Sequence, residues 1–494
     1  MKTIVDYVLH TSASFNDKPF CDADAIALSQ LSYFEMPPTV PRLDLSISPT
    51  RRRRIQETAL WGSSNNNEQR FAERTFAAFG ESGYPHLVAP DPAPRQPLSS
   101  RQMRRQQSIR KQSIPSQTFA PTSLSSSVAA DQLSTSKFSK SQKPSESSAM
   151  PLASPLASSH LRAQLYPAYS EPVPISGLLR SDWYGPLTCD VPYAQENIDL
   201  VRAMGESPRF RSGRLANVVE PADPDEDERF SALTIDLGNG VLFISLRGTD
   251  STLAGWHDDY RMAFLSPVPS QTTALSYLAR VLENWQGTII LGGHSKGGNL
   301  AVYCAALCPP AIQDRIIAVY SLDGPGFNDD FIHSPGYERI HGRVHKIIPE
   351  FSVIGPLLSS TVPVTIVKSS ASGVMQHYTA TWLFADDYRL QTTDHVSPLS
   401  QYLTTTLNTW NKRFPAQKRK LFIDSFFNAI MQAGYTDLFA AVADLRTAIP
   451  RVYAQIRKLP ADERGLMTKF LLGLANTALI RLPDLLKPEV SGNR

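Results

Sequence analysis

Short apolar runs separated by turn residues dominate the middle of the chain. The first two, at 229–236 and 241–246, flank Gly238-Asn239-Gly240, a pattern typical of a β-hairpin. Three later runs have the length and apolar character of buried strands, at 315–321, 344–348 and 362–368. The pattern therefore predicts a β-sheet at the centre of the fold.

Another apolar run, Thr288-Ile289-Ile290-Leu291, leads into Gly293-His294-Ser295-Lys296-Gly297 and then into a run of small, helix-compatible residues at 298–302. This order predicts a strand, a sharp turn and a helix. The glycines permit strained backbone geometry at the turn, so Ser295 is expected at the carboxyl edge of the sheet, beside the amino end of a helix. We interpret Ser295 as a nucleophile; the alternative is a serine that only caps the helix.

A nucleophilic serine needs a base, and the base needs a carboxylate on its other nitrogen. His377 is our candidate base because it follows the last predicted strand and lies near Trp382, whereas His395 is further along. Asp323 follows the first strand after Ser295, and Glu350 follows the second. We favour Asp323 as the acid and keep Glu350 as the alternative.

Acyl transfer also needs two backbone N–H groups directed at the developing oxyanion. One comes from the residue after the nucleophile and the other from an earlier strand-to-helix loop. Lys296 and Thr249 occupy these two positions. The Lys296 cation opposes the helix dipole, so we expect it to pair with Asp258 or Asp259, or to receive an anionic group of a substrate.

These motifs carry a family resemblance. Residues from roughly 176 to 400 resemble the α/β-hydrolase superfamily, and the segments 245–249 and 293–297 are similar to motifs of the class 3 lipases. The segments similar to a bacterial family labelled Mbeg-like are 292–299, 322–327 and the opening 22–33. The resemblance implies an α/β-hydrolase fold: a mostly parallel sheet with helices on both faces. It also implies a serine hydrolase of the lipase or esterase kind.

Composition adds limits on partners and cofactors. A net charge of +3 gives no argument for binding nucleic acid, and the four cysteines lack metal-ligand spacing. We expect no metal and no organic cofactor, and a small-molecule or lipid ester as the substrate. The amino terminus lacks the apolar core of a signal peptide, so we expect a cytoplasmic protein.

Composition also divides the chain into four parts. Residues 1–90 are expected to contribute helices to the hydrolase domain, 171–400 to form its core and 401–494 to form a C-terminal helical cap. The cap is either a fused element or a lid that supplies the acyl pocket. Residues 91–170 are rich in Ser, Pro, Gln and Arg and are predicted to be a disordered insertion.

Besides an active ester hydrolase, two functions remain open from sequence alone: a catalytically silent hydrolase fold and a protein recruited to a membrane surface. The chain is either an active ester hydrolase or a catalytically silent hydrolase fold that serves as a regulatory or scaffolding module. The basic clusters of the insertion and of 51–54 suggest contact with a membrane surface, although a solvated linker is the favoured interpretation.

Overall fold

A computed structural model describes the following residues: 1–45, 171–180, 183, 193–220, 230–249, 253, 257, 260–262, 267–436 and 444–485. The predicted insertion at 91–170 and the second half of the segment 1–90 lie outside the described residues. The four-part division of the chain therefore stays a prediction.

A single sheet runs through the described part of the chain, and its nine strands follow one another in space in the order of the sequence. The strands are β1 (Val173–Pro174), β2 (Arg214–Val219), β3 (Ala232–Asp236), β4 (Val241–Leu246), β5 (Thr288–His294), β6 (Ile316–Leu322), β7 (Val344–Pro349), β8 (Val364–Val367) and β9 (Thr392–Thr393). β4 to β8 are parallel, and the strands outside them pair antiparallel. The predicted hairpin is the β3–β4 pair. Three strands, β1, β2 and β9, were not predicted.

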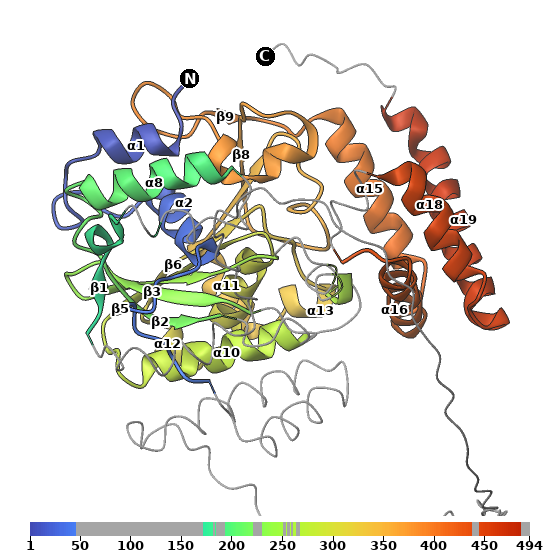
Figure 1. Ribbon diagram of the computed structural model, residues 1–494, viewed down its shortest axis with the longest axis horizontal. Helices are drawn as coiled ribbons and strands as arrows, with labels where there is room; N and C mark the ends of the chain where they lie inside the picture. The colour runs from blue at the N-terminus through green and yellow to red at the C-terminus, as the bar shows by residue number, and fades with distance from the viewer. Residues whose placement is uncertain are drawn as a thin grey trace, which may run out of the picture. The chain divides into compact units, whose positions relative to one another are not determined.

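The helices that connect the parallel strands cover one face of the sheet (Figure 1). They are α10 (Pro269–Leu282), α11 (Lys296–Leu307), α12 (Pro310–Gln313), α13 (Asp329–Ile332) and α14 (Pro335–Ile340). Crossovers between adjacent parallel strands share one hand, so a sheet whose strands follow chain order receives its connecting helices on one face. The other face must be covered by elements from elsewhere in the chain.

That second face is covered by α1 (Ile4–His10), α2 (Asp22–Gln30), the short 3₁₀ helix η1 (Leu31–Tyr33) and α8 (Ala194–Glu206). Residues 1–45 thus contribute helices that pack on the sheet, as expected of the N-terminal segment. Cys21 is the N-cap of α2, and the Asp24 carboxylate accepts the Cys21 N–H at 2.9 Å. Helices on both faces of a mostly parallel sheet confirm the predicted fold class.

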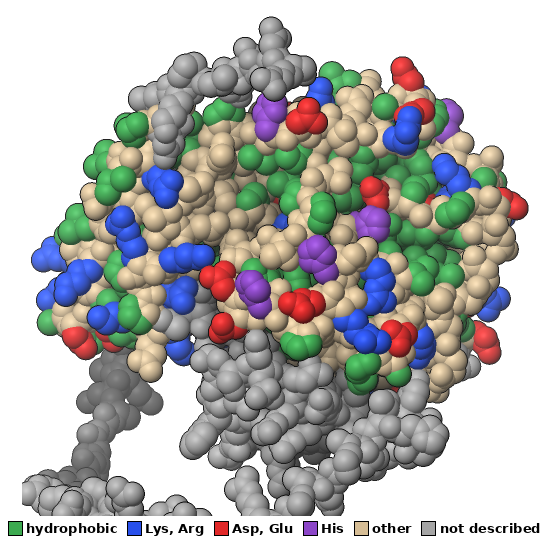
Figure 2. All heavy atoms as spheres, turned by 180° about the vertical axis from the view of Figure 1, so that it is seen from behind, with side chains coloured by type: hydrophobic (Ala, Val, Ile, Leu, Met, Phe, Trp, Pro, Cys, Tyr) green, Lys and Arg blue, Asp and Glu red, His purple; other side chains and the backbone are tan. Residues whose placement is uncertain are grey.

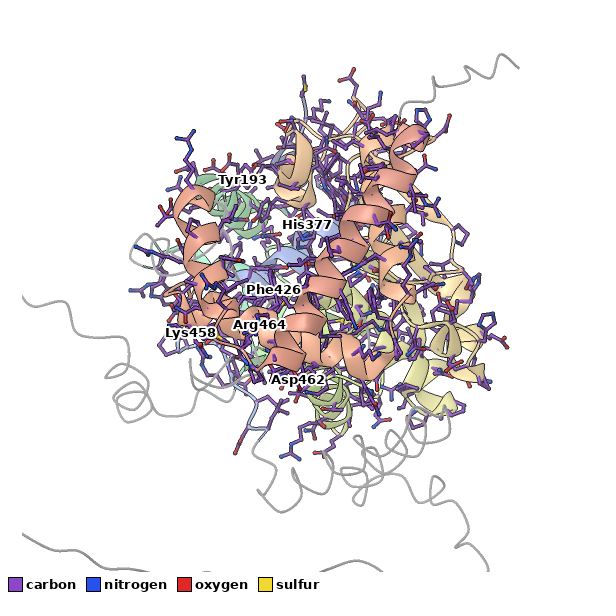
Figure 3. The ribbon with its side chains drawn as sticks, turned by 90° about the vertical axis from the view of Figure 1, so that its right-hand side faces the viewer. Tyr193, His377, Phe426, Lys458, Asp462 and Arg464 are labelled. Atoms are coloured by element: carbon purple, nitrogen blue, oxygen red, sulfur yellow. The ribbon has the colours of Figure 1, made fainter. Side chains whose placement is uncertain are left out.

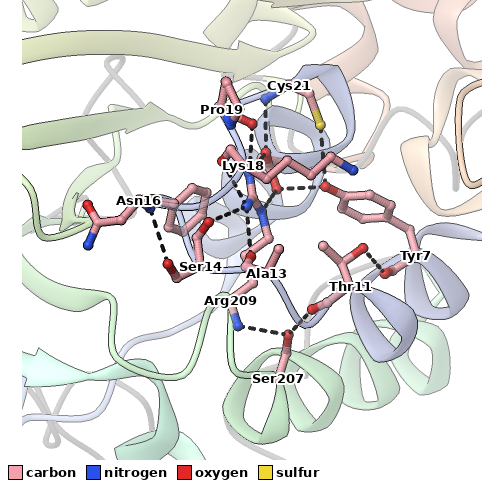
Figure 4. Close-up of polar contacts among 12 residues, drawn as sticks. Tyr7, Thr11, Ala13, Ser14, Asn16, Lys18, Pro19, Cys21, Ser207 and Arg209 are labelled. Atoms are coloured by element: carbon pink, nitrogen blue, oxygen red, sulfur yellow. Dashed lines mark hydrogen bonds and ion pairs between the residues drawn. The ribbon is translucent and has the colours of Figure 1, made fainter.

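A buried ion pair joins the N-terminal helices to the segment after α8 (Figure 4). Arg209 donates from Nε and Nη2 to the two Asp24 oxygens, each at 2.7 Å, and both side chains are fully buried. The remaining Arg209 donors meet four backbone carbonyls between Ala13 and Pro19, and Tyr7 also donates to Asp24. The network is satisfied on both sides, which a buried pair needs in order not to destabilise the fold.

The C-terminal part is helical, as predicted, and consists of α15 (Pro398–Lys412), α16 (Ala416–Gln432), α18 (Leu445–Ile456) and α19 (Ala461–Leu485). Phe422, Phe427 and Phe470 form the centre of its own apolar cluster. Figure 2 shows Lys and Arg side chains gathered at the left edge, which is the side of these helices. Arg457 and Lys458, which follow α18, are exposed. Among the described residues, no helix has both the length and the apolar character needed to cross a membrane.

Candidate active site

Ser295 lies at the turn between β5 and α11, as the sequence predicted. Its backbone has φ 56° and ψ −128°, a conformation that non-glycine residues rarely adopt. Gly297 makes the turn possible, because a Cβ there would lie 2.0 Å from the Leu246 carbonyl oxygen at the end of β4. The strain at Ser295 is therefore supported by close packing of β4 against the first turn of α11.

His377 and Asp323 meet at the same edge of the sheet. Asp323 directly follows β6, and His377 ends η4 (Gly373–His377), in the loop between β8 and β9. Nδ1 of His377 lies 2.6 Å from Oδ2 of Asp323, whose side chain is fully buried. An ionised carboxylate only accepts hydrogen bonds, so Nδ1 carries the proton and Nε2 is left as the basic nitrogen.

Asp323 is fixed by its backbone and by a second contact. Its φ of 48° is in the left-handed region, which Asp tolerates better than most residues. Ser352, which follows β7, donates its hydroxyl to Oδ1 of Asp323 at 2.5 Å. The other oxygen is thereby left for His377. Glu350 lies one strand further along and makes backbone bonds to Val367 and Ser397; no ion pair joins it to His377 within the described residues.

His294 connects the serine turn to the His377 loop. Its Nε2 donates to the backbone carbonyl of His377 at 2.7 Å, and the two imidazole rings lie 4.4 Å apart between centroids. Burial, followed by the nearby His377, holds the pKa of His294 well below its usual value. The neutral ring then accepts at Nδ1 from the Tyr33 hydroxyl, at 2.8 Å.

The Tyr33 hydroxyl also reaches the loop after β4. It accepts the backbone N–H of Gly248 at 3.1 Å, next to Thr249, the predicted oxyanion residue. Gly248 packs so tightly here that a Cβ would lie 2.4 Å from the His294 carbonyl and 3.0 Å from the Cβ of Ser295. The structure thus brings the Thr249 loop against the serine turn. The other predicted oxyanion residue, Lys296, is the first residue of α11 and directly follows Ser295.

Two lysines lie close to this site. Lys296 is buried, while Asp258 and Asp259, its predicted partners, lie outside the described residues. Lys346 on β7 is also buried; burial lowers the pKa of Lys346 to about 8, and the Asp323 carboxylate partly opposes that lowering. Lys346 therefore stands as a second lysine near the Asp323 carboxylate.

Sequence reasoning missed several supporting residues: Tyr33, Ser352 and Lys346. Tyr33 is the last residue of the segment 22–33, which resembles the Mbeg-like family. This resemblance is the one feature of the sequence that points to Tyr33. Trp382, which lies near His377 in the sequence, is buried, and its indole N–H donates to the Gln376 carbonyl at 2.9 Å. No group of three or more His, Cys, Asp or Glu residues suited to a metal occurs among the residues described.

The sheet, the serine turn and the helices on both faces define an α/β-hydrolase fold. Residues 204–428 match the Mbeg1-like family model, so this part of the chain is an Mbeg1-like domain. A solved structure that the chain resembles is the crystal structure of M37 lipase, at 16% sequence identity over 37% of this chain and 69% of that chain, with a TM-score of 0.24. No curated protein matches the sequence.

Proposed function

We propose that this protein is a serine-dependent hydrolase of carboxylic esters. The observation that carries the proposal is the 2.6 Å contact between His377 Nδ1 and Asp323, on a loop that His294 ties to the strained turn of Ser295. In serine hydrolases an aspartate orients a histidine, and the histidine accepts the proton of a serine held at such a turn.

In the proposed reaction Ser295 Oγ attacks the ester carbonyl carbon, and Nε2 of His377 takes the hydroxyl proton. The N–H groups of Thr249 and Lys296 stabilise the oxyanion of the tetrahedral intermediate. When the C–O bond breaks, the alcohol leaves with the proton from His377, and an acyl-enzyme remains. Water then repeats the sequence, releases the carboxylic acid and restores Ser295. The nucleophile and the proton acceptor are both side chains, so the steps need no cofactor.

Asp323 and Glu350, the two carboxylates between which the sequence could not decide, should respond differently to substitution. With p-nitrophenyl butyrate as substrate, we expect Asp323→Asn to lower kcat on the order of 10⁴-fold, because the histidine loses its orienting carboxylate. Glu350→Gln is the matched control, since Glu350 follows the neighbouring strand, and it should stay within a few-fold of wild type. Equal losses in both variants would remove Asp323 from its role. A folded wild type that turns over no ester of any chain length would favour the silent scaffold.

A further inference from the structure

An apolar cavity lies between the carboxyl edge of the sheet and the C-terminal helices. Its volume is about 120 Å³, and its described lining comes from segments after β4, β6 and β7 and from α15, α16 and α19. A cavity needs about 10–15 Å³ to hold one water molecule, so this one has room for several methylene groups in a row.

Several polar side chains in the cavity walls bond to other parts of the protein. Asn408 accepts from the Leu358 N–H and donates to the Pro356 carbonyl, each at 2.9 Å. The Trp410 indole donates to the Phe470 carbonyl at 3.0 Å, and Arg419 donates to the Asn411 side chain at 3.1 Å. The surface left for an occupant is therefore mainly hydrocarbon, from residues such as Met262, Ile354 and Phe422. Such a surface suits an alkyl chain rather than a polar group.

The cavity begins next to the residues that hold the active site. Gly324 packs on Ser295, where a Cβ would lie 2.9 Å from the Ser295 carbonyl oxygen, and the next residue, Pro325, lines the cavity. Ser352 holds Asp323, and the next residue, Val353, lines the cavity as well. Strands β4, β6 and β7, whose following segments form the wall, are parallel to β5 and end at the same sheet edge as Ser295.

The C-terminal helices are attached to this wall. Ser400 on α15 accepts the Ser352 N–H at 3.2 Å and donates to the Ser352 carbonyl at 2.5 Å. On the other side of the cavity, Asp424 of α16 contacts Nε2 of His257 at 2.8 Å, and Leu253 donates to the Thr436 carbonyl at 2.9 Å. Figure 3 looks onto these helices, with Phe426 on them and His377 on the core behind.

We infer that this cavity binds one unbranched alkyl or acyl chain, and that the chain is the acyl part of the ester cleaved at Ser295. The second half of the inference rests on the proposed function, whereas the binding of a chain does not. The helical cap then selects the substrate: α15 and α16 form one wall of the acyl site, and the loops after β6 and β7 form the other.

The test separates binding from turnover. In a Ser295→Ala background, which removes hydrolysis, 11-dansylaminoundecanoic acid is titrated and its fluorescence followed. We expect saturable binding that Leu357→Trp and Leu407→Trp each weaken at least tenfold, because both half-buried leucines line the cavity from opposite walls. Leu472→Trp is the control: Leu472 is 64% exposed on α19 and is not part of the lining. Leu357→Ala, which enlarges the cavity, should retain binding.

A second arm uses the active serine and p-nitrophenyl esters from acetate to decanoate. We expect Leu357→Trp to lower kcat/KM for the decanoate at least tenfold while the acetate changes less than threefold. Absence of saturable binding, or equal loss in Leu472→Trp, would overturn the inference. If the dansyl acid binds as expected but no ester is cleaved, the chain-binding site stands and the proposed function fails. If Leu407→Trp does not fold, the contrast between Leu357→Trp and Leu357→Ala decides.

Discussion

The Tyr33 hydroxyl is the residue-scale contact that joins the most distant parts of the site. Tyr33 lies 261 positions before His294, to which it donates, and 215 positions before Gly248, whose N–H it accepts. His294 in turn holds the carbonyl of His377. One hydroxyl therefore contacts the loop of Thr249, the proposed oxyanion residue, and through a neutral imidazole it supports the loop of His377, the proposed base. Tyr33 is a positioning residue, since its contacts are to these supports.

Replacement of Tyr33 by Phe should damage catalysis more than substrate binding. Gly248 loses its acceptor and His294 its donor, and small misplacements of catalytic groups cost up to about 100-fold in rate. We expect kcat to fall on the order of 10- to 100-fold with KM little changed, measured on p-nitrophenyl butyrate. Tyr277→Phe is the control, because it removes a buried hydroxyl that donates to the Asn217 carbonyl on β2 at 2.9 Å. A fall in kcat of the same size in both variants would show a general stability effect.

At the scale of elements, the N-terminal helices complete the sheet. The connecting helices occupy one face, so α1, α2 and α8 must bury the apolar side chains of the other. The Arg209–Asp24 pair holds α2 in place across 185 positions of sequence. The helix that carries the opening segment is thereby tied to the region that the Mbeg1-like family model covers.

The Arg209–Asp24 pair should contribute strongly to stability. Arg209→Met leaves the Asp24 carboxylate buried without a partner, and we expect the free energy of unfolding in urea to fall by about 3–5 kcal/mol. The double variant Arg209→Met/Asp24→Leu should recover part of that loss, because no buried charge remains. Arg389→Met, which breaks an exposed pair with Asp387, should leave unfolding unchanged. A loss no larger in Arg209→Met than in Arg389→Met would contradict the role given to the buried pair.

Local sequence patterns predicted much of the fold, because strands, turns and helices depend on residues that are close together in the sequence. The strand-turn-helix order around Ser295 and the hairpin before it follow from spacing and glycines, and both are present. The order of Ser295, Asp323 and His377 came from the strands that each one follows. The sequence could not decide between Asp323 and Glu350. The 2.6 Å contact of His377 with Asp323 depends on how neighbouring strand ends and their loops fold.

Long-range polar contacts were also beyond the sequence. Tyr33, Arg209 and Lys346 look like ordinary members of a helix end, a loop and a strand, and only tertiary packing brings them to their partners. The C-terminal helices were predicted, but the cavity beneath them depends on which loops meet which helices. Hydrophobic periodicity indicates that one face of a helix is buried, but it does not indicate which element packs against that face.

At the scale of the whole molecule, the sheet edge, the N-terminal helices and the C-terminal helices serve one site. The sheet places Ser295, Asp323 and the loop of Thr249 at neighbouring strand ends. The N-terminal helices contact the Thr249 loop through Tyr33, and Ser400 of α15 bonds to Ser352, the residue that contacts Asp323. We propose that this assembly makes Ser295 reactive.

The most direct test is labelling of the purified chain by a fluorophosphonate probe, with the modified residue located by mass spectrometry. We expect stoichiometric labelling at Ser295 in the wild type and its loss in Ser295→Ala and in His377→Ala. Labelling at another residue, labelling that persists in His377→Ala at the wild-type rate, or no labelling of the folded wild type would contradict this expectation.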